Sequence, residues 1–262
     1  MAEKSSRVIV NGLLTVIKVE HLSSNFIRIY FSCDKSLQIN PLWVGPHLKL
    51  IFADPITKAI TFPGFDEKGK LLLTENVRKL ARTYSIRKYD EVTNQLVIDF
   101  AIHAKGIAIL WAQSAKESDQ IGLFGMGSKT VFENSYLVLI GDIAAVPAIC
   151  YSLENLPDNQ KASAFIEVKH QSDVMPLPNN DNVEINWLIA NSLQPNQLID
   201  SVIAANLPTH DDLLFWGGME SSLAQQLRHA IKDKYSDLNA DAVQIISYWR
   251  EGFAEGEFRH RE

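Results

Sequence analysis

The sequence predicts two domains of different fold class: an antiparallel six-stranded β-barrel, followed by an α/β domain with a parallel sheet. In the first half, short runs of alternating or β-branched apolar residues are separated by polar turns, a pattern typical of antiparallel barrels. In the second half, apolar runs alternate with helical patterns, which predicts parallel strands covered by helices. The loop at 125–134 lies between the two patterns, and we place the boundary after residue 128. The expected domains are therefore 1–128 and 129–262.

The barrel strands are predicted from alternation and from the turns that interrupt it. The polar segment 21–25 separates the first two strands, and Asp54-Pro55 closes the third. A helix over 106–115 is expected just before the last strand. The six expected strands are 14–20, 26–32, 48–53, 83–88, 95–102 and 121–124.

The α/β domain opens on a strand of the fully buried type at 136–140. The segment 221–234 is strongly amphipathic and is expected to be a helix that covers the sheet. The other expected helices are 144–154 and 197–205. The remaining expected strands are 164–168, 184–190, 213–216 and 243–248.

The composition excludes several classes of function. With 46% hydrophobic and 21% charged residues among 262, the chain is globular and too apolar to be disordered. Its net charge of −6 argues against nucleic acid and anionic membranes as partners, so an anionic ligand would need a local basic pocket. Cys33 and Cys150 are too few for a disulfide framework, an iron–sulfur cluster or a four-thiolate zinc site. The histidines show no metal-ligand spacing, and we expect no metal site.

The same sequence predicts a compartment. Residues 1–6 lack the apolar core of a secretory signal. The most apolar stretch, 136–153, contains Asp142 and Pro147 and is too short and too interrupted to span a bilayer. We therefore expect a cytoplasmic protein with reduced thiols and no membrane partner.

The sharpest motif is Arg-Thr-Tyr-Ser-Ile-Arg at 82–87. Because side chains alternate along a strand, Arg82 and Tyr84 are expected on one face and Thr83 and Ser85 on the other. An arginine suits a pyrophosphate, a tyrosine offers a flat ring, and a serine hydroxyl can donate to a ring nitrogen. An extended ligand along the strand edge would be reached from both faces. The alternative, an exposed strand with surface arginines, stays open at this point.

Two further segments are typical of nucleotide binding. Gly106 can take a positive φ and precedes a helix whose N-terminal amides and dipole suit a phosphate, with Lys105 beside it. The alternative is that Gly106 only turns the chain, and Ile107, Leu110 and Trp111 have the spacing of core residues. The small residues at 141–148 follow a buried strand and would let a nucleotide approach closely. This segment has no Gly-x-Gly-x-x-Gly pattern and is also compatible with an ordinary turn.

These residues resemble a known family. Arg-x-Tyr-Ser/Thr-x-Arg at 82–87 is similar to the flavin-binding signature of the siderophore-interacting proteins, which are FAD-dependent ferric-siderophore reductases. Further stretches resemble that family in the same order along both domains. They are His-Leu-Lys-Leu at 47–50, Asp-Phe-Ala-Ile-His at 99–103, the glycine turn and helix start at 106–111, Gly-Asp-Ile-Ala-Ala-Val-Pro-Ala-Ile at 141–149, Gly-Met-Glu at 218–220 and Tyr-Trp-Arg-Glu-Gly at 248–252.

The resemblance implies a fold and a reaction. The barrel would bind FAD, and the second domain would be a ferredoxin-reductase-like domain that binds a nicotinamide nucleotide. Electrons would pass from NADH or NADPH through FAD to the Fe(III) of a ferric siderophore, releasing Fe(II) in the cytoplasm. No side chain is expected to act as a catalytic acid or base, because the flavin carries the chemistry.

The resemblance also implies the site residues. Those expected to bind the cofactors are Arg82, Thr83, Tyr84, Ser85, Asp99, His103, Gly106, Ile107, Ala108 and Trp111 in the barrel, and Gly141, Asp142, Ala144 and Ala145 in the second domain. For an anionic siderophore, the candidates are Lys49, Lys129 and Arg250, which we expect to meet at the mouth between the two domains.

The sequence departs from the family at three places. Gly-Met-Gly-Ser-Lys at 125–129 replaces Gly-Pro-Arg-Gly, Ala144 replaces a threonine, and Met219 interrupts Gly-Glu. Two alternatives remain open: a flavin reductase that exchanges electrons with ferredoxin or flavodoxin, and a non-catalytic module that holds flavin or siderophore. The donor is also open among NADH, NADPH and ferredoxin, because Lys169 and His170 suit either a 2′-phosphate or an exposed surface. We expect a monomer.

Overall fold

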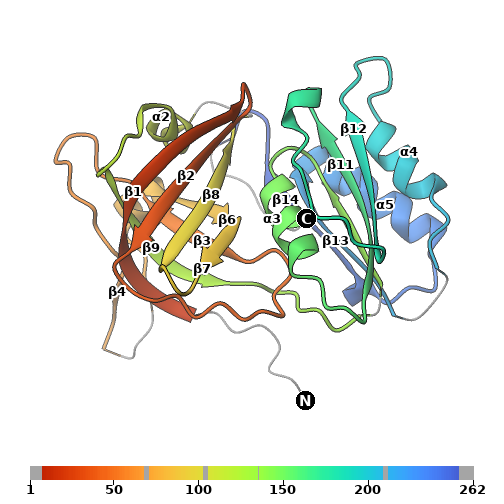
Figure 1. The fold of residues 1–262 in the computed structure, drawn as a ribbon, viewed down its shortest axis with the longest axis horizontal. Helices are drawn as coiled ribbons and strands as arrows, with labels where there is room; N and C mark the ends of the chain where they lie inside the picture. The colour runs from red at the N-terminus through yellow and green to blue at the C-terminus, as the bar shows by residue number, and fades with distance from the viewer. Residues whose placement is uncertain (1–7, 68–70, 103–105, 135, 209–211, 254–262) are drawn as a thin grey trace. The chain divides into compact units, whose positions relative to one another are not determined.

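The computed structural model describes residues 8–67, 71–102, 106–134, 136–208 and 212–253. It divides into two compact units, Met1–Val131 and Phe132–Glu262 (Figure 1). The first unit is built on an antiparallel sheet and the second on a parallel sheet, as the sequence predicts. No helix among the described residues is long and apolar enough to cross a bilayer.

The first unit contains a seven-stranded sheet in the order β6-β3-β9-β1-β2-β8-β7, with antiparallel neighbours throughout, and a separate two-stranded ladder of β4 and β5. Its elements are β1 (Val8–Ser23), β2 (Phe26–Cys33), β3 (His47–Ile51), β4 (Gly64–Phe65), β5 (Leu71–Leu72), α1 (Glu75–Leu80), β6 (Ala81–Ser85), β7 (Lys88–Asp90), β8 (Gln95–Ala101), α2 (Ile107–Ser114) and β9 (Gln120–Gly127).

The sheet closes into a barrel between β6 and β7. These strands stand at opposite ends of the hydrogen-bonded order, yet only Ile86 and Arg87 separate them in the chain. Ile86 donates its N–H to Pro46 beside β3, and Arg87 donates its N–H to Val97 of β8. The two ends of the sheet must therefore meet, and the interior is filled by side chains such as Phe31 and Phe100.

This closure corrects the predicted number of strands from six to seven. The sequence predicts one strand over 83–88, but the backbone changes its pairing partner from β3 to β8 at Ile86. The sequence has no glycine or proline at this point, so the pattern alone does not reveal the change. Lys88–Asp90 is therefore a strand of its own, joined to β8 by a hairpin.

Two expected loops belong to strands. The segment 21–25 was expected to be a turn, but β1 continues to Ser23 and leaves a two-residue turn before Phe26. The segment 125–134 was expected to be a linker, but β9 continues to Gly127. Gly125 has a φ of 53° at a register shift between β3 and β9, so a glycine is required at this bulge.

Helix α1 was not predicted from the sequence. Thr74 caps its N-terminus by accepting the N–H of Val77 at 3.3 Å. Glu75 lies in its first turn and Arg78 and Lys79 in its last, which suits the helix dipole. The Thr-Glu start was the available signal, and the helix is too short for apolar periodicity to mark it.

The second unit is a five-stranded parallel sheet in the order β12-β11-β10-β13-β14. Its elements are β10 (Tyr136–Gly141), α3 (Val146–Glu154), β11 (Lys161–Val168), η1 (Gln171–Asp173), β12 (Val183–Ile189), α4 (Gln197–Ala204), β13 (Leu213–Glu220), α5 (Ser221–Lys234), η2 (Ala240–Ala242) and β14 (Val243–Trp249).

Helices cover both faces of this sheet (Figure 1). Val138 and Ile140 of β10 pack in one core with Leu227 and Ile231 of α5 and with residues of α4. The alternate residues of β10 point to the opposite face, which α3 covers. In chain order the strands read 3-2-1-4-5, the doubly wound arrangement in which ligands bind outside the carboxyl ends of strands 1 and 4. The fold therefore directs attention to the ends of β10 and β13.

Candidate functional site

Strand β6 carries the motif Arg-Thr-Tyr-Ser at one end of the hydrogen-bonded order. The bonds from Phe52 to Leu80 and from Ile86 to Pro46 fix which peptide groups of β6 face β3. Because pairing alternates along an antiparallel ladder, the backbone groups of Thr83 and Ser85 point away from β3. They face the seam of the barrel, the edge of β6 that lies toward β8.

The side chains of this motif divide between the two faces of β6, as predicted. Arg82 and Tyr84 pair with Leu50 and Leu48, which point into the barrel. Thr83 therefore lies on the outer face, and the Nζ of Lys49 donates to its Oγ1 at 2.8 Å. A ligand along the seam would meet groups from both faces.

An aromatic chain connects the motif with helix α2. The ring centroids of Tyr84 and Phe100 are 4.5 Å apart, and those of Phe100 and Trp111 are 6.0 Å apart. Trp111 also packs on Phe31 and Phe52. Its side chain is therefore part of the barrel packing, as its spacing suggests, and it sets α2 beside the seam. Leu110, also expected in the core, is 63% exposed.

The N-terminus of α2 has an open approach. Gly106 is its N-cap, with no side-chain hydrogen bond, and a Cβ built on Gly106 would meet no atom within 4 Å. Its φ is −179°, extended backbone that any residue can adopt, so this conformation does not require the freedom of a glycine. Ile107 and the buried Ala108 begin the helix. His103 and Lys105, which we expected beside this site, lie outside the described residues.

Asp99 is the centre of a buried ion pair on the outer face of the barrel. The guanidinium of Arg28, directly opposite on β2, donates to both of its oxygens at 2.6 and 2.7 Å. The Nε of Arg87 lies 3.8 Å from Oδ2, and the carboxylate side chain is fully buried. The pair with Asp99 raises the pKa of Arg28 above its ordinary value. Asp99 is thus bound by Arg28 and lies within ion-pair distance of Arg87, the last residue of the motif, a role that sequence reasoning missed.

In the second unit, three glycines lie at positions where the surrounding atoms leave no room for a Cβ. A Cβ on Gly217 would lie 2.1 Å from the carbonyl oxygen of Ile140, and one on Gly218 would lie 2.6 Å from the ring of Tyr248. A Cβ on Gly141 would lie 2.6 Å from the Cβ of the buried Ala145. Packing inside this unit alone therefore requires small residues at the ends of β10 and β13.

Asp142 ties the carboxyl ends of three strands together. Its Oδ1 accepts the N–H of Ala144 at 2.8 Å, and its Oδ2 accepts those of Glu220 and of the Trp249 indole, both at 2.8 Å. Glu220 in turn caps α5 by accepting the N–H groups of Ser222 and Leu223. Burial raises the pKa of Asp142 to about 6, against the lowering effect of its N–H donors.

This shift predicts a pH dependence of stability. Because Asp142 binds its proton more tightly when folded, its contribution is fully present below the unfolded pKa near 3.8 and is lost as pH rises through about 6. We expect the unfolding free energy of Asp142→Asn to rise by about 2 kcal/mol relative to that of the native protein between pH 4 and pH 7, at roughly 1.4 kcal/mol per pKa unit. Denaturant unfolding at four pH values measures this difference.

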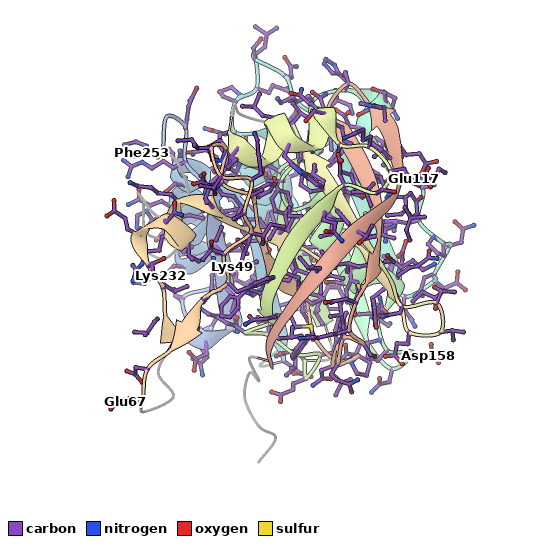
Figure 2. All side chains as sticks on the ribbon, turned by 90° about the vertical axis from the view of Figure 1, so that its left-hand side faces the viewer. Lys49, Glu67, Glu117, Asp158, Lys232 and Phe253 are labelled. Atoms are coloured by element: carbon purple, nitrogen blue, oxygen red, sulfur yellow. The ribbon has the colours of Figure 1, made fainter. Side chains whose placement is uncertain are left out.

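The control is Asp158→Asn, at an exposed aspartate of the same unit (Figure 2). Its unfolding free energy should run parallel to that of the native protein over the whole range. If the unfolding free energy of Asp142→Asn also stays parallel to that of the native protein, the burial of Asp142 does not cause the pH dependence of stability.

The basic residues that are candidates for binding the siderophore lie on both units. Lys49 is half-buried on β3 (Figure 2), and Lys129 is exposed just after β9. On the second unit, Arg250 is exposed after β14, with its guanidinium 4.5 Å from the centre of the Phe253 ring.

In comparisons with known proteins, both units match family models that are named for siderophore-interacting proteins. Residues 15–129 match the siderophore-interacting FAD-binding domain, and residues 134–252 match the siderophore-interacting protein domain. Over 256 residues the chain is 26% identical to the ferric vibriobactin reductase of Vibrio cholerae, covering 95% of this chain and 93% of that protein. It is 28% identical over 241 residues to the NADPH-dependent ferric-chelate reductase of Escherichia coli, covering 90% of this chain and 91% of that protein.

A solved structure supports the fold. The siderophore utilization protein from T. fusca superposes with a TM-score of 0.79 at 24% identity, covering 98% of this chain and all of that chain. The ferredoxin reductase of a carbazole 1,9a-dioxygenase superposes with a TM-score of 0.66 at 14% identity, covering 92% of this chain and 70% of that chain. The ferredoxin-reductase-like architecture predicted from the sequence is confirmed.

Proposed function

The chain belongs to the siderophore-interacting protein family, and we propose on that premise that it passes electrons from NAD(P)H through FAD to the Fe(III) of a ferric siderophore. The observation that carries the assignment of sites is the joint placement of β6 and α2 in the first unit. The chain of Tyr84, Phe100 and Trp111 sets the motif strand beside a helix N-terminus. A dinucleotide needs both an anchor for its pyrophosphate and a surface for its ring.

The residues of the first unit fit FAD. The open approach at Gly106 leaves room for a phosphate at the N-terminus of α2. Arg82 uses Nη1 to bind the carbonyl oxygens of Lys79 and Ala81, so within the described part of the chain its other N–H groups remain available to the pyrophosphate. The backbone groups of Thr83 and Ser85 face the seam, along which the ring would be held.

FAD, when bound, links a two-electron donor to a one-electron acceptor. The chain's own residues only bind, orient and exclude water. Reduction releases the iron because the hard oxygen ligands of a siderophore bind Fe(II) less tightly than Fe(III). In the second unit, the nucleotide would bind outside β10 and β13, above the turn that Asp142 holds through Ala144.

The decisive experiment is a sequence of three spectra. Purified protein should show a flavin spectrum, lose it anaerobically with NADH or NADPH, and regain it on adding a ferric siderophore, with Fe(II) captured by a ferrous chelator. Absence of flavin, or a reduced flavin that no ferric siderophore reoxidises, contradicts the proposed function. A flavin that stays oxidised with both nucleotides would redirect the search to another donor.

We expect Lys49, Lys129 and Arg250 to attract the anionic ferric siderophore, since an acidic protein needs a local positive site. The triple alanine variant should keep its FAD and its reduction by nicotinamide nucleotide. Its KM for the siderophore should rise about tenfold, because each exposed contact contributes roughly 0.2–1 kcal/mol. High salt should raise the native KM and hardly change that of the variant. Steady-state kinetics at low and high salt measure both effects.

The matched control replaces three exposed lysines elsewhere, Lys35, Lys161 and Lys232 (Figure 2 shows Lys232). It removes the same net charge, so any difference between the two triple variants reports position. Equal KM values and salt slopes in both would remove the three cations from the siderophore site.

Three finer statements belong to the same proposal. We propose the cytoplasm as the compartment, where NAD(P)H is available and the thiols of Cys33 and Cys150 stay reduced. We propose a monomer, which sedimentation would test. Reduced ferredoxin is the second candidate donor, and anaerobic reduction of the flavin by ferredoxin but by neither nucleotide would favour it.

A further inference from the structure

The carboxyl edge of the parallel sheet bears an acidic side chain on its second strand. Glu167 lies near the end of β11, one residue beyond the pairing of Gly141 with Ile166. This register puts it beside Asp142, at the edge where the strand order places the nucleotide. It stands roughly 25 residues after Gly141. In doubly wound nucleotide-binding folds, an acidic residue about 20 residues after the first turn receives the 2′-hydroxyl of the adenosine ribose.

The side chain of Glu167 is held by a hydrogen bond, and its carboxylate can still accept others. The Nε2 of Gln197, at the start of α4, donates to its Oε2 at 3.0 Å and to the carbonyl of Ile189 at 2.8 Å. Gln197 is thus anchored between the end of β12 and Glu167 and fixes the direction of the carboxylate. A carboxylate accepts about four hydrogen bonds, so one donor leaves room for a ribose hydroxyl.

The surroundings of Glu167 disfavour a further negative group. Asp142 and Glu220 stand at the same edge, joined by the bond from the Glu220 N–H to Oδ2 of Asp142. Burial and the charge of Asp142 raise the pKa of Glu167. A 2′-phosphate carries nearly two negative charges, and like charges brought together inside a site cost binding energy.

The basic residues that follow do not replace this acidic one. His170 and Lys169 are exposed beyond the end of β11. The His170 side chain is an acceptor in the capping box of η1, where its backbone N–H also bonds Asp173 at 3.0 Å. This contact occupies one ring nitrogen of His170, so only the other can carry a proton toward a phosphate.

Resting on the proposed function, we propose that Glu167 binds the 2′-hydroxyl of the adenosine ribose and makes NADH, rather than NADPH, the preferred electron donor. The carboxylate accepts a hydrogen bond from the hydroxyl of NADH and repels the 2′-phosphate of NADPH. Glu167 therefore determines specificity without touching the atoms that exchange the hydride.

The test compares the native FAD-loaded protein with Glu167→Gln. The native kcat/KM for NADH should exceed that for NADPH about tenfold or more, as expected for a charge-assisted hydrogen bond. Glu167→Gln should lower the value for NADH and raise that for NADPH, bringing the ratio close to one. Calorimetric titration with NAD⁺ and NADP⁺ should show the same change in Kd. The control is Glu184→Gln, an exposed glutamate of β12 near the opposite end of the sheet, which should keep the native ratio.

The two measurements separate this inference from the proposed function. Native preference for NADPH, or an unchanged ratio in Glu167→Gln, overturns the role of Glu167 while leaving the reductase intact. If neither nucleotide bleaches the flavin, the proposed donor fails, and the titrations still decide: NAD⁺ binding that Glu167→Gln weakens supports the inference. Equal Kd values for both nucleotides, or binding of neither, overturns it.

Discussion

Arg82→Ala and Tyr84→Ala should yield folded protein that has lost most of its yellow colour. In the proposed FAD site, Arg82 would offer guanidinium N–H groups to the pyrophosphate, and a charge-assisted contact of this kind is worth about 1.5–3 kcal/mol. The Kd for FAD should therefore rise roughly 10- to 100-fold in the arginine variant. Tyr84 also packs on Phe100, so its loss removes the ring surface and loosens the edge of β6. Equilibrium dialysis against FAD measures both Kd values.

The matched control is Arg78→Ala, an exposed arginine on α1 just before the motif. Its Nε donates to the carbonyl of Leu73 at 3.2 Å, away from the proposed site, so FAD affinity should stay native. Far-ultraviolet circular dichroism of all three variants shows whether the barrel is intact. Native FAD affinity in a folded Arg82→Ala protein would remove the motif from the flavin site.

The faces of the motif strand could be predicted because they depend on local geometry. Alternation along 82–87 places Tyr84 and Thr83 on opposite faces of the strand, and the structure pairs Tyr84 with the buried Leu48 and Thr83 with Lys49. The partner of each strand is a different matter. Nothing in the residues around Ile86 records that the backbone leaves β3 and joins β8, because the change depends on strands far along the chain.

For the same reason, the partners of the buried charged residues could not be predicted from the sequence. Arg28 and Asp99 are separated by 71 positions and meet only through the pairing of β2 with β8. Asp142 is expected at the nucleotide, which stays a prediction, and its carboxylate accepts the Trp249 indole N–H and the Glu220 backbone N–H. In each case the residue type was noticed, but its partner lies on another strand.

Gly217→Ala should abolish electron transfer from nicotinamide nucleotide while FAD stays bound. The added Cβ would lie 2.1 Å from the carbonyl oxygen of Ile140, which is backbone and cannot rotate away. Strands β10 and β13 must separate, at a cost of about 3 kcal/mol. In the proposed site, the carboxyl ends of these strands position Asp142 and the nucleotide, and a displacement near 1 Å can lower a rate roughly 100-fold. We expect at least that loss in the rate of flavin bleaching by NADH or NADPH, measured anaerobically by stopped flow.

Retention of FAD makes this outcome specific to the second unit, because β6 and α2 both belong to the first. The control is Gly64→Ala in the first unit, where an added Cβ meets nothing within 4 Å, and its melting temperature and bleaching rate should be native. Unfolding of the second unit is distinguished from a local shift by repeating the bleaching well below the melting transition of Gly217→Ala. A variant with native melting and native bleaching would show that β10 and β13 tolerate a Cβ between them. In that case the contact between Gly217 and Ile140 does not set the geometry at the carboxyl ends of these strands, and the placement of the nucleotide there loses its structural basis.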